Sequence, residues 1–387
     1  MVTRARGRTQ STLAALAALV VGGALALAGL GCGGSGGAFE RAKFAGDRAN
    51  SAGLYNEAAG HYRAAAAQAG SARERDEALY LEAATYQRAG ERGRAVAAYE
   101  ALVRASPKGE RSDRARFDAA FLRAQAGEAR GWAELEAELY AHPSAGSARR
   151  ALEVLARRAD EASPGGGLAW LEGAQKRLGS TELAENVEYL RAHALLQGGR
   201  LREARAAFAQ TAERHPYPYG ALVDDAWWHA SLLDEKLGDP RAAVADLERL
   251  LASREQPALG QGSYERARYD DAQFRIGTLY RDALGDEAAA RRAFRRVYRN
   301  FPVSTLRDDA VWAEARLARR AGDRAALCSL AAQLRDTFAE SRYAGCSALL
   351  CATVAPPPKA IPCRAYLRRE WEGPEAAPSA EAAPQRP

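Results

Sequence analysis

Apolar residues recur along the chain at helical spacing, and glycines separate one apolar stripe from the next. In the first copy, Gly53 precedes Tyr55, Ala58, Tyr62 and Ala65. This spacing places the apolar side chains on one face of a helix. A glycine can adopt the positive φ of a tight turn after a helix. The pattern therefore predicts pairs of antiparallel helices joined at glycine turns.

The same pattern returns along most of the chain. Later copies begin at Gly90, Gly199, Gly238, Gly285 and Gly322. Several of the second helices are followed by a proline, which cannot continue a helix. The sequence therefore predicts an all-α fold, a right-handed solenoid of about eight antiparallel helix pairs over residues 38–352.

Three departures interrupt the pattern. Trp132 stands where a small residue is expected after Gly127. The run Pro-Gly-Gly-Gly at 164–167 is expected to break one worn repeat, which gives a degenerate repeat near residues 145–180. A wider interval later in the chain places extra residues in a loop at 256–262.

The turn glycines, the small residues after them and the aromatic residues at helical spacing resemble the tetratricopeptide repeat, over most of residues 39–352. The intervals from Gly53 to Gly90 and from Gly90 to Gly127 are 37 residues, longer than the usual length of about 34. The resemblance implies a non-catalytic scaffold that binds protein partners.

The sequences at the junctions between the helix pairs indicate which group of tetratricopeptide-repeat proteins the chain resembles. Phe301-Pro302-Val303-Ser304 and the related junctions at Pro107 and Pro216 resemble those of periplasmic repeat proteins of the Gram-negative outer membrane. The similar families are the BamD-like lipoproteins and the repeat domain of the Tol-Pal-associated coordinator (YbgF/CpoB type). This resemblance implies envelope proteins as partners, in outer-membrane assembly or in Tol-Pal/peptidoglycan coordination. The alternative is an accessory module that binds peptide or glycan and regulates peptidoglycan synthesis or secretion.

A basic and apolar leader precedes the repeats. Arg4, Arg6 and Arg8 are followed by an uncharged apolar stretch over 13–30, which is typical of an export signal. We therefore expect residues 1–31 to direct the chain out of the cytoplasm. The alternatives are an ordinary signal peptide without lipidation and an uncleaved anchor helix.

Cys32 directly follows the apolar stretch, and residues 33–37 form a Gly/Ser tether. This arrangement resembles a bacterial lipoprotein signal, which implies that Cys32 is lipidated and anchors the chain to the membrane. Gly33 stands where such proteins carry an aspartate if they are retained in the inner membrane. The resemblance therefore implies attachment to the outer membrane, on its periplasmic face.

The net charge is smaller when the three arginines of the leader are left out. The whole chain carries a formal charge of +6, and without the three leader arginines it carries +3. A nearly neutral chain of this length is not a strongly basic nucleic-acid binder. We therefore expect no nucleic-acid partner.

An aromatic residue recurs ten or eleven positions before most turn glycines. These residues are Tyr80, Phe117, Tyr189, Trp228, Phe274 and Trp312. On a helical wheel, this position lies at the edge of the first helix, between its packed face and the expected groove. The aromatic column is therefore either a set of packing residues or a ladder of partner-binding anchors. Because Trp227 and Trp228 are adjacent, we expect one of them to be partly exposed.

Four further cysteines lie near the C-terminal end. They are Cys328, Cys346, Cys351 and Cys363. In an oxidising compartment an even number of cysteines favours disulfides, with three possible pairings of four. If helices over 325–338 and 341–352 form an antiparallel hairpin, Cys328 and Cys351 lie at matching distances from its turn. We therefore favour the pairs Cys328–Cys351 and Cys346–Cys363, and the alternative is buried or free thiols.

Residues 353–387 are rich in proline and alanine, so we expect this tail to be mostly disordered. Within it, only the stretch from Cys363 to Trp371 has the composition to dock onto the fold.

The sequence contains no recognisable catalytic or cofactor-binding motif, neither a phosphate-binding glycine loop nor a metalloprotease or serine-hydrolase signature. The histidines are scattered, and we expect each to be a surface or packed side chain. They are His61, His142, His193, His215 and His229. The cysteines lack the spacing of a zinc site. We therefore predict a non-enzymatic protein with no cofactor and no metal, and the alternative is an enzyme with an unrecognised site.

Overall fold

The computed structural model describes residues 36–217, 219–252 and 268–372, and every regular element in these ranges is a helix. The predicted leader, Cys32, the loop at 256–262 and residues 373–387 lie outside the described ranges. Among the helices that are described, none is both long and apolar enough to cross a bilayer.

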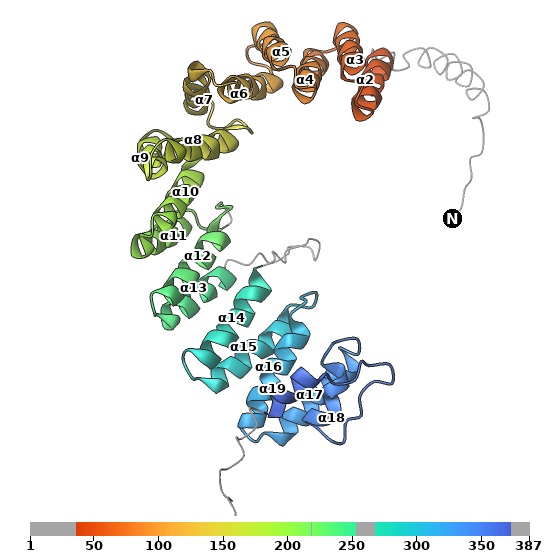
Figure 1. Cartoon of the computed structure of the whole chain (residues 1–387), viewed down its shortest axis with the longest axis vertical. Helices are drawn as coiled ribbons and strands as arrows, with labels where there is room; N and C mark the ends of the chain where they lie inside the picture. The colour runs from red at the N-terminus through yellow and green to blue at the C-terminus, as the bar shows by residue number, and fades with distance from the viewer. Residues whose placement is uncertain (1–35, 218, 253–267, 373–387) are drawn as a thin grey trace, which may run out of the picture. The chain divides into compact units, whose positions relative to one another are not determined.

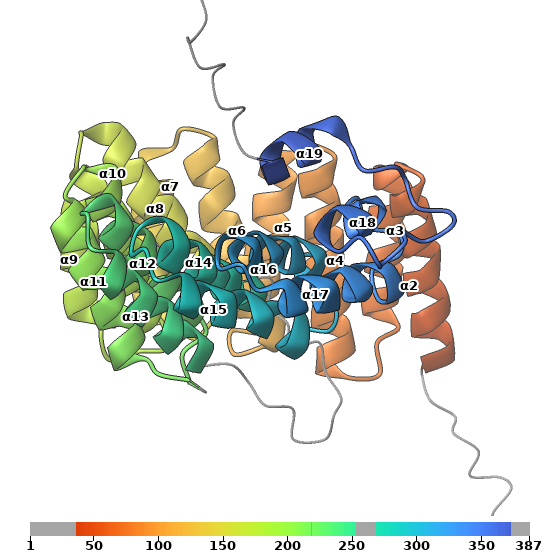
Figure 2. The same cartoon turned by 90° about the horizontal axis from the view of Figure 1, so that it is seen from below.

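The chain divides into two compact units on either side of the bond between Arg158 and Ala159. Within each unit, helices that follow one another in the sequence pack together, as α2 does with α3 and α11 with α12 (Figure 1 and Figure 2). The first unit contains α2 (Gly36–Ser51), α3 (Tyr55–Ala67), α4 (Ala72–Arg88), α5 (Arg92–Ala105), α6 (Glu110–Gln125), α7 (Ala129–Ala141) and the larger part of α8 (Ala148–Ala162).

The second unit holds the remaining helices. They are α9 (Gly166–Leu178), α10 (Ala184–Gln197), α11 (Leu201–Arg214), α12 (Val223–Lys236), α13 (Pro240–Ala252), α14 (Tyr269–Asp282), α15 (Glu287–Asn300), α16 (Arg307–Arg320), α17 (Arg324–Asp336), the 3-10 helix η1 (Ala344–Cys346), α18 (Ser347–Leu350) and α19 (Ala365–Glu372). We call the first and second helices of each pair the A helix and the B helix.

A glycine with positive φ joins the A helix to the B helix in each pair from α2/α3 to α16/α17. The φ values lie between 66° and 83° at Gly53, Gly90, Gly127, Gly165, Gly199, Gly238, Gly285 and Gly322. L-residues with a Cβ rarely adopt this conformation, which explains the recurrence of glycine. The predicted all-α array of about eight helix pairs is confirmed in the described residues.

The sequence pattern predicted that the glycine run at 164–167 breaks a repeat. In the structure, this run instead forms the turn between α8 and α9. Gly165 has φ 77° and is the N-cap of α9. A Cβ on Gly166 would lie 2.2 Å from the carbonyl oxygen of Ala159 in α8, so the next position must also be small. The run therefore supplies the positive φ at Gly165 and the small residue at Gly166 that the turn between α8 and α9 requires.

In the pairs α2/α3 and α14/α15, an aromatic ring of the B helix packs against a glycine of the A helix. A Cβ on Gly46 would lie 2.7 Å from the Tyr62 ring, and a Cβ on Gly277 would lie 2.7 Å from the Phe294 ring. Tyr62 and Phe294 occupy equivalent positions, nine residues after their turn glycines, and both are buried. This contact sets the close approach of the two helices.

The large side chain of Trp132 is accommodated because the neighbouring Gly131 makes the close contact with α6. The preceding residue, Gly131, packs against the backbone of α6, where a Cβ would lie 2.3 Å from the amide nitrogen of Ala124. Trp132 itself is half-buried beneath the guanidinium of Arg158, 5.5 Å from the ring centroid. The small residue expected at position 132 is therefore supplied one position earlier.

The C-terminal hairpin is shorter than predicted. α17 lies close to the expected range, but the helix expected over 341–352 is wrong, because this stretch contains only η1 and α18. The chain at Ile361 returns across Gly345, where a Cβ would lie 1.9 Å from the Ile361 carbonyl oxygen. This close approach leaves no room for a continuous helix with side chains at position 345.

Two disulfides cross-link this region. Cys328 is bonded to Cys351, with a Cα–Cα distance of 4.9 Å, and Cys346 is bonded to Cys363, with a distance of 4.6 Å. These are the pairs that the hairpin argument favoured. The second disulfide holds the chain just before α19, which is the stretch of the tail expected to dock.

Replacing Gly165 with alanine should lower the free energy of unfolding by about 1 kcal/mol, because the Cβ disfavours positive φ. The matched control is Gly173→Ala in α9, where the added Cβ meets open space. This change should raise the unfolding free energy by about 0.5–1 kcal/mol through helix propensity. Urea unfolding of the two variants measures the difference, and equal effects would contradict the assignment of Gly165 as a repeat turn.

Candidate functional site

The aromatic column divides into buried and half-buried members. Tyr80, Phe117 and Trp312 are only 7%, 3% and 3% exposed. The Tyr80 hydroxyl donates a 2.7 Å hydrogen bond to Asp118 of the next A helix, and the Trp312 ring stacks on Tyr343. The low exposure of these three rings favours the packing interpretation, although Phe117 also lines a cavity between α6 and the start of α8.

The other three members are Tyr189, Trp228 and Phe274, which are half-buried. Trp227 is buried and Trp228 is partly exposed, as expected for this adjacent pair. The guanidinium of Arg268 lies 5.5 Å from the Trp228 ring centroid and forms an ion pair with Asp225 at 2.7 Å. The Trp228 ring therefore lies beside a charged pair.

Two histidines that looked scattered in the sequence meet between α10 and α12. The ring centroids of His193 and His229 are 4.7 Å apart, and His229 stacks on Phe208 at 4.9 Å. Burial among these rings lowers the pKa of His229 to about 4, and the nearby His193 and Arg268 lower it further. Burial also lowers the pKa of His193, against the opposing charge of Asp225. Both rings are therefore neutral packing groups at neutral pH.

Arginines of the B helices fix the next A helix through buried carboxylates. The pairs are Arg63 with Glu82, Arg205 with Asp234, and Arg295 with Glu314. Each carboxylate is almost fully buried, and Tyr298 also donates a 2.7 Å hydrogen bond to Glu314. Since loss of one partner would leave a buried charge, these contacts set how consecutive helix pairs stack.

Three cavities are lined mainly by A helices. In the first unit, a cavity of about 590 Å³ lies along α2, α4 and the start of α6, and one of about 620 Å³ lies between α6 and the start of α8. In the second unit, a cavity of about 320 Å³ lies along α10, α12 and α14. A further cavity of about 440 Å³ in the first unit is lined by α5, α6 and α7, so concave sites also occur beside B helices. We call the surface formed by the A helices within each unit the A-helix surface.

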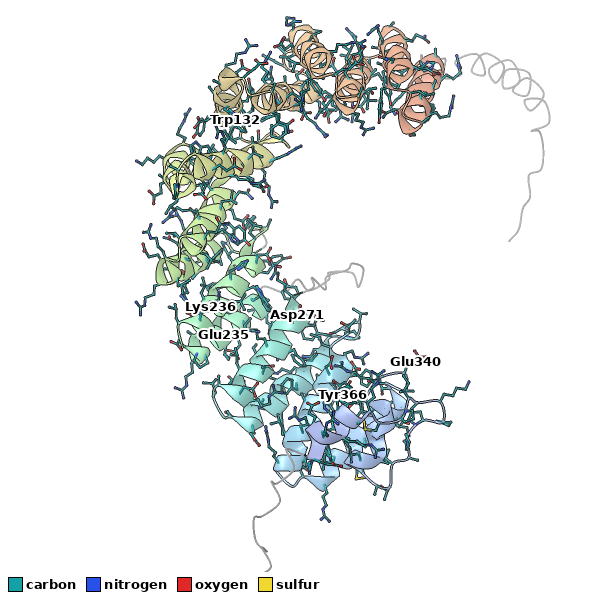
Figure 3. All side chains as sticks on the ribbon, viewed as in Figure 1. Trp132, Glu235, Lys236, Asp271, Glu340 and Tyr366 are labelled. Carbon is teal, nitrogen blue, oxygen red and sulfur yellow. A yellow bond between two sulfur atoms is a disulfide. The ribbon has the colours of Figure 1, made fainter. Side chains whose placement is uncertain are left out.

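The cavity of the second unit combines apolar walls with charged groups. Leu196 and Leu232 are half-buried, and Arg275 donates two hydrogen bonds of 2.5 and 2.6 Å to Glu235. Lys236 follows Glu235 at the end of α12, where the two side chains are labelled in Figure 3. Leu232 and Glu235 lie about one and two helical turns beyond Trp228, and Arg275 directly follows Phe274, so none of them belongs to the aromatic column that the sequence pattern marks.

The described residues contain no cluster of three or more His, Cys, Asp or Glu side chains that could hold a metal ion.

Two segments of the chain, residues 77–109 and 271–304, match the family model of the tetratricopeptide repeat. These segments are tetratricopeptide repeats. The first covers the later part of α4 with α5, and the second covers α14 with α15. Tetratricopeptide repeats typically act as non-catalytic scaffolds that bind protein partners on stacked helix pairs, and the presence of such repeats suggests this kind of role.

Several solved structures are similar to the chain at low identity. The C-terminal part of a tetratricopeptide-repeat protein from Cytophaga hutchinsonii is 14% identical, with a TM-score of 0.41, and the alignment covers 70% of this chain and 98% of that one. PilW, a type IV pilus biogenesis factor, is 16% identical, with a TM-score of 0.30 and coverage of 69% and 94%. The TPR2AB domain of yeast Sti1 is 14% identical, with a TM-score of 0.28 and coverage of 73% and 99%. No curated protein sequence matches the chain.

The stability of the repeats should fall as the pH decreases from 6.5 to about 4. The fold favours neutral His229, whose pKa is about 4 against an ordinary value of 6.5, so the unfolded chain binds more protons in this window. We expect a loss of about 1 kcal/mol from this partly exposed ring. Unfolding in urea at several pH values measures it.

A His229→Phe variant preserves the stacking on Phe208 and removes the titrating group. Its unfolding free energy should depend less on pH than that of the native chain. The same slope in both proteins would contradict the role of His229.

Proposed function

We propose that the chain is a lipid-anchored scaffold on the periplasmic face of the outer membrane. In this proposal, Cys32 carries the lipid and the tetratricopeptide repeats hold protein components of an envelope machine, of the outer-membrane assembly or Tol-Pal/peptidoglycan-coordination type. The export leader and the glycine-rich tether support the anchor, and the junction sequences support the type of machine.

The observation that best supports export is the pair of disulfides near the C-terminal end. Cys328–Cys351 and Cys346–Cys363 use all four cysteines of the described residues. Disulfides persist in oxidising compartments such as the bacterial periplasm and are rare in the cytosol. Two independent features of the chain, its leader and its cross-links, therefore favour the same compartment.

The charge distribution supports recognition of folded protein surfaces. Carboxylates and guanidinium groups of neighbouring A helices pair with one another, as Glu77 does with Arg111 and Glu235 with Arg275. Little unbalanced charge remains to attract a polyanion. Partner choice in this proposal depends on the shape of the cavities and on local ion pairs.

Expression in a Gram-negative host tests the anchor. We expect mass spectrometry to find a mature chain that begins at a diacylated Cys32, and we expect a Cys32→Ser variant to leave the membrane fraction. The control is the double variant Cys328→Ser/Cys351→Ser, which removes two cysteines but should remain with the membrane. A mature N-terminus without lipid would refute the anchor.

Affinity purification from detergent-solubilised membranes tests the scaffold role. We expect specific envelope proteins to co-purify with the native chain in reproducible amounts. Binding to isolated peptidoglycan without any protein partner would instead support the accessory module that recognises peptide or glycan.

A further inference from the structure

In α4, α6, α12 and α16, one face of the A helix packs against the B helix that precedes it. Arg63 of α3 bonds to Glu82 on this face, and Arg295 of α15 bonds to Glu314. The residues twelve, eight and five positions before the turn glycine share this face, and all of them are buried. They are Ala78, Glu82 and Thr85 in α4, Ala115, Ala119 and Leu122 in α6, Ala226, Ala230 and Leu233 in α12, and Ala310, Glu314 and Leu317 in α16.

The equivalent face of α2 has a different composition. α2 is the first helix that the structure describes, and its three equivalent positions hold Arg41, Ala45 and Arg48. Both arginines are exposed, and neither forms an ion pair with any residue of the described ranges. Charged side chains at these positions disfavour the packing of a further B helix, as the polar outer face of a terminal repeat does.

The rest of α2 leaves this face positively charged. Phe44, which is 54% exposed, lies between the two arginines along the helix, with Lys43 Nζ 5.8 Å from its ring centroid. The carboxylates of α2 are engaged elsewhere. Glu40 lines the cavity shared with α4, and Asp47 accepts hydrogen bonds from Lys43 and Tyr62. Unlike the paired charges of the A-helix surface, this face therefore presents two unpaired guanidinium groups beside an aromatic ring.

The position of α2 in the chain indicates what this face meets. Gly36 begins α2 four residues after Cys32, so a fully extended chain separates the two Cα atoms by at most about 14 Å. A lipid on Cys32 would thus hold the start of α2 close to the bilayer surface. Arginine and aromatic side chains are typical of helices that lie at this interface, where anionic headgroups attract the positive charge.

We propose that the face of α2 formed by Arg41, Phe44 and Arg48 contacts the anionic phospholipid headgroups of the bilayer to which the chain is anchored. This inference rests on the anchor in the proposed function, because the anchor brings the face to the membrane. The lipid then holds the chain at the bilayer, and the face sets which end of the first unit lies against it. A second copy of the chain is not the occupant, since two such faces carry like charges.

A chemically attached alkyl chain tests this contact. The mature chain from Cys32 to Pro387 has one free thiol, because its other four cysteines are bonded to one another. A maleimide that carries a 14-carbon alkyl chain therefore reacts with Cys32 alone. A single acyl chain of this length binds membranes reversibly, with a constant of about 10⁴ M⁻¹, so a contribution from the protein surface is measurable. The result does not depend on whether a cell lipidates Cys32.

Co-sedimentation measures binding to vesicles of phosphatidylcholine alone and to vesicles of equal parts phosphatidylglycerol and phosphatidylcholine. We expect the native chain to bind the anionic vesicles about thirtyfold more tightly, through two arginines near the surface. Arg41→Gln/Arg48→Gln should remove most of this preference. The matched control is Arg92→Gln/Arg157→Gln, which replaces two exposed arginines of α5 and α8 and leaves the same net charge. The control should keep the preference.

Circular dichroism and the unfolding midpoint establish that each variant is folded, and the exposure of both arginines allows their substitution. The inference is overturned if the native chain binds both kinds of vesicle equally, or if the two double variants lose the preference equally. It is also overturned if Arg41→Gln/Arg48→Gln keeps the preference but loses a co-purifying envelope protein, because the face would then bind a protein. A cellular N-terminus without lipid, together with the expected vesicle preference, would refute the proposed anchor and leave the phospholipid affinity of this face intact.

Discussion

The array depends on one packing constraint that recurs in its helix pairs. An aromatic ring of the B helix occupies the space left by a glycine of the A helix in two pairs, where Tyr62 packs at Gly46 and Phe294 at Gly277. The turn glycine sets the angle at which the two helices meet, because it supplies a conformation that other residues rarely adopt. Once the pair is closed, the buried carboxylates of the A helices can reach the arginines of the preceding B helices, and the pairs stack in order.

Much of this architecture could be predicted from sequence because its determinants are local. Turn glycines and apolar spacing act within some twenty residues, so they predicted the helix pairs. The predictions were wrong at two places where the same local sequence is compatible with two structures. The glycines at 164–167 were expected to interrupt a repeat but form its turn, and residues 341–352 have helical composition but are displaced by the returning chain at Ile361. The contact between Ile361 and Gly345 joins residues that are distant in the sequence, so the periodicity of apolar residues does not predict it.

The candidate site was harder to predict than the fold. The aromatic column was identified by its register, but register alone does not say whether Tyr80 or Trp312 is covered by a neighbour. The cavity residues Leu232 and Lys236 belong to ordinary helical positions and gain their importance from Arg275 and Leu196 on adjacent A helices. Similarly, His193 and His229 meet only because α10 and α12 lie side by side.

The C-terminal segment also bears on how the array could change in length. η1 and α18 pack against α17, and α19 packs against α16, so the helices of the last pair are covered where a further pair would have to stack. The two disulfides make this cover covalent. A further repeat therefore cannot stack on the last pair unless this cover is displaced. α19 therefore acts as a cap on the last helix pair, as terminal elements of repeat proteins do.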